Sequence, residues 1–479
     1  MNPLRKGVDS NGKIIAILII IFWAFFAALI HVKPTPRLIL PFLALNGILL
    51  ILFPFKTYFP IFAVMSFAYP SFMLISKIGG RTVEILELFL IFLIVVMFIE
   101  VIWKDFKFKL TPISFLICIF LILTAIQIYR GVSFGYKLPL VRTAGRNLAM
   151  WSVFLPMSVY LQNTDNAEKL IKYCLIGWGL GSAFYILSYL GIFTSSGIYV
   201  PNRPFWPSTL NIAIFFPLLI LLIIPFERGL NRPNYIYHGG LLILSLLILI
   251  PTQARTIYVL LAIQIVVLSV ITTLVQKKGQ KYIYFLKVIF VFAIVGVLSV
   301  ILLKIFMGEN FDILVQTLLR RFDTANNLRS DLSLNARRWQ VYESMIRIRG
   351  HWIFGRGIGF EWNSFKGIYK IDNLYFALLI HFGLVGLGVF AIIIGLWFHR
   401  GVWLIIHRDE LESYFLKAFV LSQPAVILAI LSTGFTGSGF AYTTSNVTIM
   451  VYWIILTEYF YIKLRRKKIS PPVPKTSEA

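Results

Sequence analysis

The residues best suited to chemistry in this sequence are arginines that recur between apolar segments. A guanidinium group offers a planar fork of hydrogen-bond donors that matches the oxygen atoms of a phosphate. Arg255 is the most informative, because it follows Pro251-Thr252-Gln253-Ala254 between two apolar segments, where a charge is costly unless it is paired or functional. Alternatively, Arg255 extends to the membrane headgroups, as basic residues at helix ends commonly do. The other arginines of this kind are Arg142, Arg146, Arg203, Arg320, Arg321, Arg337, Arg338 and Arg356.

A carboxylate stands at the start of a later apolar segment, in Asp372-Asn373-Leu374-Tyr375. Beside arginines that hold a phosphate, Asp372 could act as a general base. The alternative is that Asp372 caps the helix by accepting backbone hydrogen bonds. His381, in the same segment, suits helix packing or headgroup contact better than catalysis. No cluster of His, Asp and Glu has metal-ligand spacing and no Walker-type phosphate loop occurs, so we expect neither a metal nor another cofactor.

The elements that position these residues must be membrane helices. Hydrophobic residues make up 58% of the 479 residues and charged residues only 14%, which excludes a water-soluble protein. The net charge of +25 does not indicate a nucleic-acid partner, because the basic residues lie between apolar segments and no recognition module separates from them. Cys118 and Cys174 lie inside apolar segments, so neither a disulfide framework nor a thiolate metal site is expected.

We expect an all-α polytopic membrane protein with about 14 transmembrane helices, because apolar segments of bilayer length recur along the chain and lipid offers no partners to other backbone conformations. The expected spans are residues 14–32, 38–55, 58–76, 84–103, 110–129, 146–162, 170–193, 207–226, 237–253, 256–275, 287–307, 374–398, 413–434 and 443–462.

The basic loops predict the orientation of these spans, because lysine and arginine concentrate in short cytoplasmic loops. With the expected spans, all such loops fall on the side of the N-terminus. The residues concerned are Lys104, Lys107, Lys109, Lys277, Lys278, Lys281, Lys287, Arg400, Arg408 and the basic residues of 463–468. We therefore expect two cytoplasmic termini, an N-terminal bundle (1–307), one large extracytoplasmic loop (308–371), C-terminal transmembrane helices (372–463) and a cytoplasmic tail (464–479).

The large loop should be folded, because it is rich in apolar residues. We expect Asn335 to cap a helix over 336–349 that ends at Gly350, with Arg338, Tyr342 and Ile346 on one face. A glycine-rich turn follows over 354–359, where the backbone can approach another group closely. The apolar residues expected to dock the loop against the membrane bundle are Trp339, Tyr342, Ile346, Trp352, Ile353 and Phe354.

Three stretches, in this order, resemble the O-antigen ligase and polymerase superfamily, bacterial enzymes that transfer undecaprenyl-diphosphate-linked glycans outside the cytoplasmic membrane. The first is Thr252-x-x-Arg255. The second is Arg338-Trp-Gln-Val-Tyr342 leading into His351-Trp-Ile-Phe-Gly-Arg-Gly-Ile-Gly359. The third is Asp372-Asn373-x-Tyr375 leading into Gly383-Leu-Val-Gly386. Together they cover about a third of the chain, and the segment from Asn202-Arg203-Pro204 to Asn211 also looks like an outer loop of the family.

The resemblance implies that Arg255 and Arg338 hold the lipid diphosphate, with Arg337 as an equally permissible register for the second. In the mechanism that we expect, Arg203 assists them and Asp372 deprotonates the acceptor hydroxyl. The activated leaving group makes a nucleotide or metal unnecessary. Further residues expected to contact the substrate are Arg321, Arg146, Tyr342, Asn373 and Tyr375.

The ligases of this superfamily usually carry His-Asn where this sequence has Asp372-Asn373, a form that looks more like the polysaccharide repeat-unit polymerases. We therefore expect a glycan polymerase of the bacterial cytoplasmic membrane that works on the extracytoplasmic face. A ligase with the same lipid donor, which attaches the glycan to lipid A core or to protein, stays open. So does a flippase or transporter for lipid-linked sugars. The expected partners are the undecaprenyl-diphosphate-linked glycan, membrane lipid, and assembly proteins such as a flippase and a chain-length regulator.

Overall fold

The computed structural model is a bundle of mainly apolar helices with one small β-hairpin. The structure describes residues 55–68, 75–78, 81–103, 110–162, 166–189, 209–224, 234–252, 255–275, 281–308, 311–313, 315–316, 319, 332–360, 373–436 and 444–469.

Within these residues, six helices are long and apolar enough to cross a membrane, so the protein is membrane-embedded. They are α5 (Pro112–Ser133), α11 (Arg255–Val275), α12 (Lys281–Met307), α15 (Leu374–Ile406), α16 (Tyr414–Thr436) and α18 (Thr444–Ile469). Shorter apolar segments lie in α3 (Phe55–Ala68), α4 (Ile85–Trp103), α9 (Thr209–Ile223) and α10 (Tyr235–Thr252). The expected count of about 14 spans is not confirmed, and the first two, except Phe55, lie outside the described residues.

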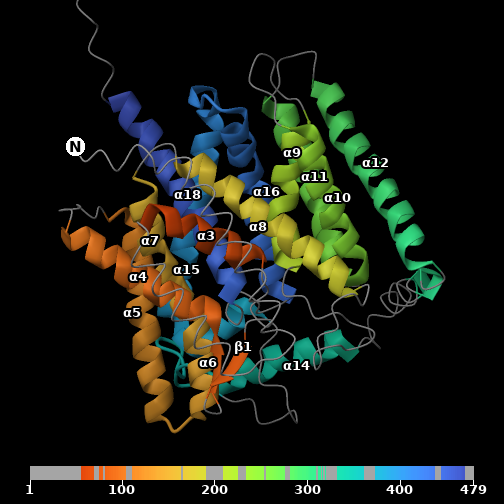
Figure 1. The fold of residues 1–479 in the computed structure, drawn as a ribbon. Helices are drawn as coiled ribbons and strands as arrows, with labels where there is room; N and C mark the ends of the chain where they lie inside the picture. Colours follow the sequence, from red (N-terminus) through yellow and green to blue (C-terminus); the bar gives the residue numbers. More distant parts are fainter. Residues whose placement is uncertain are drawn as a thin grey trace, which may run out of the picture.

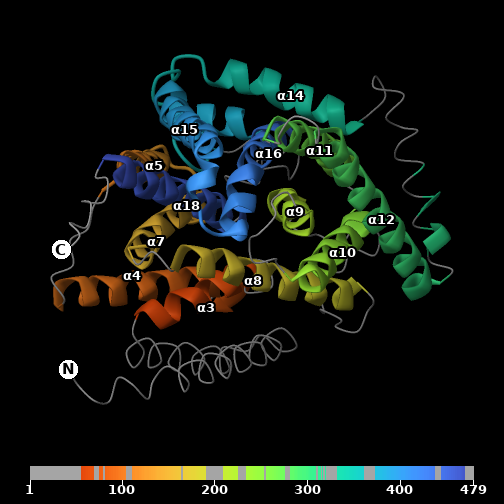
Figure 2. The ribbon, with the colours of Figure 1, turned by 90° about the horizontal axis from the view of Figure 1, so that it is seen from above.

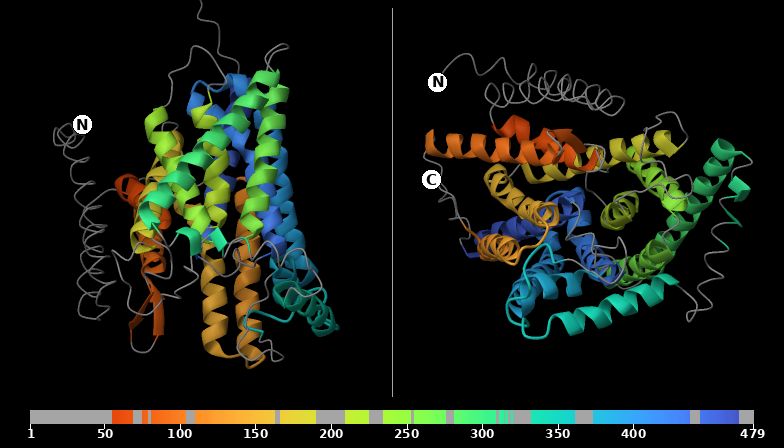
Figure 3. Two further views of the ribbon diagram at one scale, coloured as in Figure 1. Left: turned by 90° about the vertical axis from the view of Figure 1, so that its right-hand side faces the viewer. Right: turned by 90° about the horizontal axis from the view of Figure 1, so that it is seen from below.

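The helices form two sides around a centre, as the view from above shows (Figure 2). α3, α4 and α8 (Asn166–Tyr189) line one side, while α15 and α14 (Leu332–Arg347) line the other, and α9 stands end-on between them. α15 packs against α5, α16 and α18. The helix α14 crosses the lower end of the bundle instead of running along it (Figures 1 and 3).

Two ends of the bundle matter below. The end that carries α14, the turn after α5 and the start of α15 is named the loop end, and it lies at the bottom of Figure 1. The opposite end carries the basic last turns of α18 and the short helix η4 (Arg408–Glu410), and it is named the tail end.

The hairpin was not expected from the sequence. The strands β1 (Ile75–Ile78) and β2 (Arg81–Glu84) pair antiparallel, with Ile78 opposite Arg81. The two residues between them in the sequence are Gly79 and Gly80, a pair typical of tight hairpin turns. The predicted span 58–76 is therefore wrong at its end: α3 stops at Ala68, shortly before Pro70, which cannot continue a helix.

The expected span 146–162 is not one regular helix. The chain there forms α6 (Leu138–Ala149), the 3₁₀ turn η3 (Met150–Val153) and α7 (Phe154–Tyr160). Pro156 explains the interruption, because it has no backbone N–H and its ring would clash with the carbonyl of residue 152 in a regular α-helix. The more tightly wound 3₁₀ turn η3 connects the two α-helices at this interruption.

The helix of the large loop exists, but its start and its docking differ from the expectation. α14 begins at Leu332, so Asn335 lies inside the helix and is not its cap. Gly350, in the left-handed region at φ +79°, follows the end of the helix as expected.

The prediction that six apolar side chains dock the loop against the bundle is wrong. All six are solvent-exposed in the structure, from 37% for Trp352 to 59% for Ile353. The physical reason is that the loop docks through its backbone and its glycines, as shown below, so these side chains point outward. Exposed aromatic side chains beside membrane helices suit the interface of a bilayer.

Candidate functional site

The loop end is built around a break in α15. Gly383 has φ +68° and ψ −165°, so the regular helix stops there and resumes at the next residue. A break in a membrane helix frees backbone donors and acceptors that lipid cannot satisfy. Some other segment must therefore supply partners for them.

The segment 351–360, named here the strap, supplies these partners. On one side of the break, Leu384 N donates to Trp352 O at 2.8 Å and Val385 N donates to Ile353 O at 3.1 Å. On the other side, Arg356 N donates to Ile380 O at 2.6 Å and Gly357 N donates to His381 O at 3.2 Å. The strap thus exchanges backbone hydrogen bonds with both halves of the broken helix.

Glycine is required where the two backbones cross. A Cβ atom on Gly383 would overlap the carbonyl of Ile353, and one on Gly355 would lie 2.6 Å from Gly383 N. Gly355 also has a positive φ of +67°. The expectation that the glycine-rich turn allows a close backbone approach is confirmed, and the group it approaches is the broken helix.

The other edge of the strap is held by the last turns of α5. Ile358 N donates to Gln127 O at 3.0 Å, while Gln127 Nε2 and an Arg130 guanidinium N–H both donate to Phe354 O at 2.8 Å. His381 adds a contact from α15, since its Nδ1 lies 3.0 Å from Gly357 O. A carbonyl only accepts, so Nδ1 carries the proton. His381 is buried, so its expected packing role is confirmed.

Two guanidinium groups lie beside the strap. Arg130 stacks over Phe134 at 5.5 Å, and Arg356 stacks over Phe360 at 5.3 Å while its Nε donates to Arg347 O. Within the described part of the chain, neither has a carboxylate partner. Burial lowers the pKa of the His351 imidazole, and the charges of Arg356 and Arg130 lower it further.

Burial and the two positive charges also act on the phenol of Tyr136, which lies just after α5. Burial raises its pKa, and the neighbouring charges of Arg356 and Arg130 partly offset that rise. Tyr136 donates a hydrogen bond of 3.2 Å to Arg356 O. The loop end is thus electropositive next to a rigid backbone, which suits the binding of an anion.

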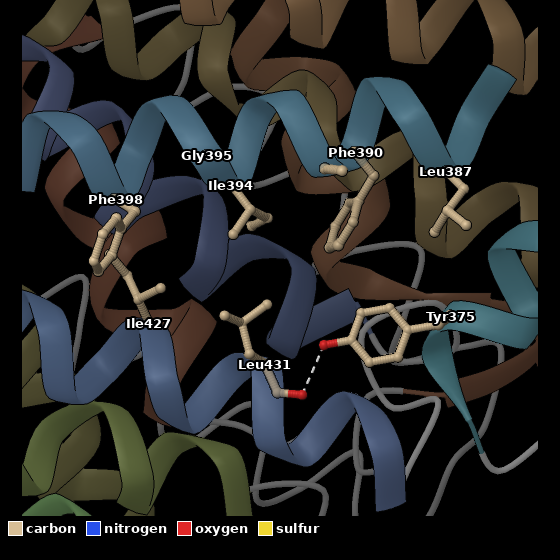
Figure 4. Close-up of a pocket in the computed structure, with 9 residues that line it drawn as sticks. Tyr375, Leu387, Phe390, Ile394, Gly395, Phe398, Ile427 and Leu431 are labelled. Carbon is tan, nitrogen blue, oxygen red and sulfur yellow. Dashed lines mark hydrogen bonds between the residues drawn. The ribbon is translucent and has the colours of Figure 1, made fainter. Parts of the chain in front are cut away.

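An apolar groove of about 320 Å³ lies between α15 and α16, and Tyr375, in the first turn of α15, lines one part of it. Asn373 caps the helix by accepting a hydrogen bond of 3.1 Å from Phe376 N, so the cap is Asn373 and not Asp372. Tyr375 donates a hydrogen bond of 2.7 Å to Leu431 O across the groove (Figure 4). The rest of the lining is apolar: Leu387, Phe390, Ala391, Ile394, Gly395, Phe398, Ile427 and Leu431.

The predicted site residues are only partly described. Arg338 and Tyr342 lie on the exposed face of α14, and Trp339 packs edge-on against Tyr342 with ring centroids 5.6 Å apart. Arg255 is the first residue of α11, and Arg337 lies in α14, but their side chains are outside the described residues. Arg203, Arg321 and Asp372 lie outside them entirely.

Arg146 has a different partner from the one expected. Its Nε lies 2.5 Å from Glu87 Oε1, and both side chains are about 15% exposed. The ion pair joins α6 to α4, so this guanidinium is engaged inside the protein.

Sequence reasoning missed Gln127 and Arg130 as functional residues. They lie three residues apart at the end of an otherwise apolar segment, and polar residues there are usually retained for a purpose. That spacing is the signal that could have found them. Arg356 was noticed only as one of many arginines.

Comparison with known proteins provides no relatives from which to assign the site. No family model matches the sequence, and no curated protein and no solved structure is significantly similar to it.

Proposed function

We propose that this protein is an extracytoplasmic glycan polymerase that uses undecaprenyl-diphosphate-linked saccharides. One observation supports this above all: the strap that bridges the broken helix α15 lies beside the guanidinium groups of Arg130 and Arg356, which have no carboxylate partner among the described residues, and α15 also lines an apolar groove. A polyprenyl diphosphate has the same two parts, a doubly phosphorylated head and a long apolar chain. The head suits Arg130, Arg356 and Arg338, and the chain suits the groove.

The orientation in this proposal follows from the basic residues. The last turn of α18 is basic, and Arg408 lies at the same end of the bundle. Such residues favour the cytoplasmic side, which puts the loop end outside the membrane. The protein would then work at the outer face of the bacterial cytoplasmic membrane, where lipid-linked glycans are displayed.

The reaction moves a glycan between two lipid carriers. The bond between the anomeric carbon and the diphosphate oxygen breaks, and undecaprenyl diphosphate leaves with that electron pair. The acceptor hydroxyl of another lipid-linked repeat unit forms the new bond to the anomeric carbon, and its proton passes to Asp372. Arg255 and Arg338 stabilise the negative charge that builds on the leaving diphosphate, with Arg203 and Arg337 as further cations.

The test replaces Arg255 and Arg338 singly by alanine and by lysine and measures long-chain glycan in membranes. We expect both alanine variants to lose most polymerisation and the lysine variants to keep part of it, because lysine keeps the charge but not the two-pronged geometry. Arg465→Ala is the matched control, since Arg465 is an exposed arginine of α18 at the tail end. Full activity in both alanine variants would refute the phosphate role.

The glycan pattern of a deletion strain tests the reaction class. Single repeat units left on the final acceptor indicate a lost polymerase. Accumulation of long chains on undecaprenyl diphosphate would instead show that the protein is a ligase. Transport of a labelled lipid-linked sugar by purified protein, with no elongation, would contradict both.

A further inference from the structure

A second polar site lies at the tail end, away from the strap. A pocket of about 590 Å³ opens there between the start of α5, the end of α7 and residues 455–466 of α18. Its lining combines apolar surface with several polar side chains: Thr111, Ser114, Ser158, Leu161, Gln162, Ile455, Glu458, Tyr459, Ile462, Lys463 and Arg466.

Glu458 is the acidic residue that lines this pocket. Its side chain is only 1% exposed and its Oε2 pairs with Arg400 of α15, which is 7% exposed. Arg400 also stacks over the ring of Tyr461 at 5.0 Å. Apart from this ion pair, neither carboxylate oxygen of Glu458, Oε1 or Oε2, has a hydrogen-bond donor among the described residues. A buried carboxylate oxygen without a donor is costly, so a ligand that donates to it would gain affinity.

The mouth of the pocket is cationic. Within the basic end of α18, Lys467 pairs with Glu412 at 3.9 Å and Lys468 pairs with Glu410 at 2.9 Å. The two basic residues that line the pocket, Lys463 and Arg466, have no such partner in the described part of the chain. Both follow Glu458 along α18 and line the same pocket.

The start of α5 adds positive potential. Thr111 caps this 22-residue helix by accepting a hydrogen bond of 3.1 Å from Ser114 N, and both hydroxyl residues line the pocket. The N-terminus of a helix favours anions through its dipole. Since Arg400 balances Glu458, the charge left over in the pocket is positive.

We propose that this pocket binds a phosphate ester whose alcohol part carries a hydrogen-bond donor. Lys463, Arg466 and the start of α5 hold the phosphate at the mouth, while a hydroxyl or ammonium group of the same molecule donates to Glu458 Oε1. A phospholipid headgroup of the adjoining leaflet has this chemistry, and so does a small soluble phosphate ester. The site is separate from the loop end and does not depend on the proposed glycan transfer.

The experiment uses the full-length purified protein in neutral detergent and two probes that share the headgroup. Phosphatidylglycerol presents the phosphoglycerol group on a lipid, and glycerol 1-phosphate presents it in solution. Bound lipid is counted by native mass spectrometry, and glycerol 1-phosphate binding by calorimetry. Phosphatidylcholine is the comparison lipid, because its headgroup has a phosphate but no hydrogen-bond donor.

The variants separate the pocket from general surface charge. K463Q/R466Q removes the two unpaired cations, and K467Q/K468Q removes the same charge from residues that have acidic partners. We expect the first pair to weaken binding of the phosphoglycerol probe by about tenfold or more, because it removes the charged donors to the phosphate, and the second pair to leave that binding unchanged. Both pairs change exposed side chains only, so folding should be kept.

Two further results complete the test. Wild-type protein should prefer phosphatidylglycerol over phosphatidylcholine, and E458Q should reduce that preference if it folds. Binding of phosphatidylglycerol alone identifies a lipid site, and binding of glycerol 1-phosphate as well identifies a soluble ligand. Equal loss in the two double variants, equal binding of the two lipids, or no binding of either phosphoglycerol probe would overturn the proposal.

Discussion

Polar groups inside the bundle find their partners in different ways at the two ends of α15. Near the loop end the helix breaks at Gly383, and the polar groups at risk are backbone groups, which the strap satisfies by exchanging hydrogen bonds. Near the tail end the helix is regular, and the polar groups at risk are the charges of Arg400 and Glu458, which pair with each other.

The backbone crossing at the strap depends on glycines, which have no side chain. The contact near the tail end depends on two opposite charges that neutralise each other. The strap therefore leaves Arg130 and Arg356 without carboxylate partners in the described region, available to a ligand. The charges of the buried pair neutralise each other, and the Glu458 carboxylate has no further donor in the described region. This difference predicts which substitutions each end will tolerate.

The largest effect is expected for Gly383→Val. The new side chain would meet the Ile353 carbonyl and would have to adopt a left-handed backbone, so we expect a loss of about 4 kcal/mol or more in the free energy of unfolding. Thermal denaturation in detergent measures this loss. Gly388→Ala is the control, because a Cβ there meets nothing within 4 Å. Equal midpoints for the two variants would show that the crossing is not tight.

The second effect concerns the buried pair. Arg400→Met leaves Glu458 as an uncompensated buried charge, and breaking such a pair costs about 3–5 kcal/mol. The double variant R400M/E458M removes both charges and should regain most of that loss. Thermal midpoints of the three proteins give the comparison. A double variant as unstable as the single one would mean that packing, and not charge, dominates there.

The third effect is on the strap alone. Gln127→Leu removes one of the two side-chain donors to Phe354 O, which we expect to cost about 1 kcal/mol. Q127L/R130A removes both donors and should cost more than the sum of the two single changes, because the carbonyl is then left without a side-chain partner. Hydrogen–deuterium exchange of a peptide covering the strap measures local opening, while exchange in α16 should not change. If the strap peptide exchanges at the same rate in wild type and in all variants, these two side chains do not hold the strap.

These effects also show what the sequence alone could predict. Apolar length located the bundle, and α11 begins at Arg255, the residue that interrupts the apolar segments in the sequence. The glycine-rich turn was recognised because glycine occurs there at every second position, a pattern that allows a close backbone approach.

The break at Gly383 could not be predicted, since glycine is common in membrane helices and the residues on either side are apolar. Its partner is 30 residues away in sequence, counting from Ile353. The ion pair of Arg146 was not predicted either, because nothing in the sequence indicates that Glu87 lies near α6. Long-range contacts of this kind follow from packing and not from local pattern.

The smallest effect is the pH dependence contributed by His351. Burial first, and then Arg356 and Arg130, lower its pKa in the folded protein below the ordinary value of about 6.5. The unfolded chain then binds its proton more readily than the folded protein does. The resulting stability is present above about pH 6.5 and is lost as the pH falls through the lower, folded-state pKa.

The measurement is the thermal midpoint of wild type and H351Q between pH 7.5 and 5.5, with their difference isolating His351 from other titrating groups. We expect wild type to lose slightly more stability than H351Q on acidification. Arg130→Gln should narrow that difference, because it removes one of the two cations that disfavour the charged imidazole. A wild type that gains stability relative to H351Q at low pH would mean that the strap end is not electropositive, and the contrast with the charge-neutral pair at the tail end would fail.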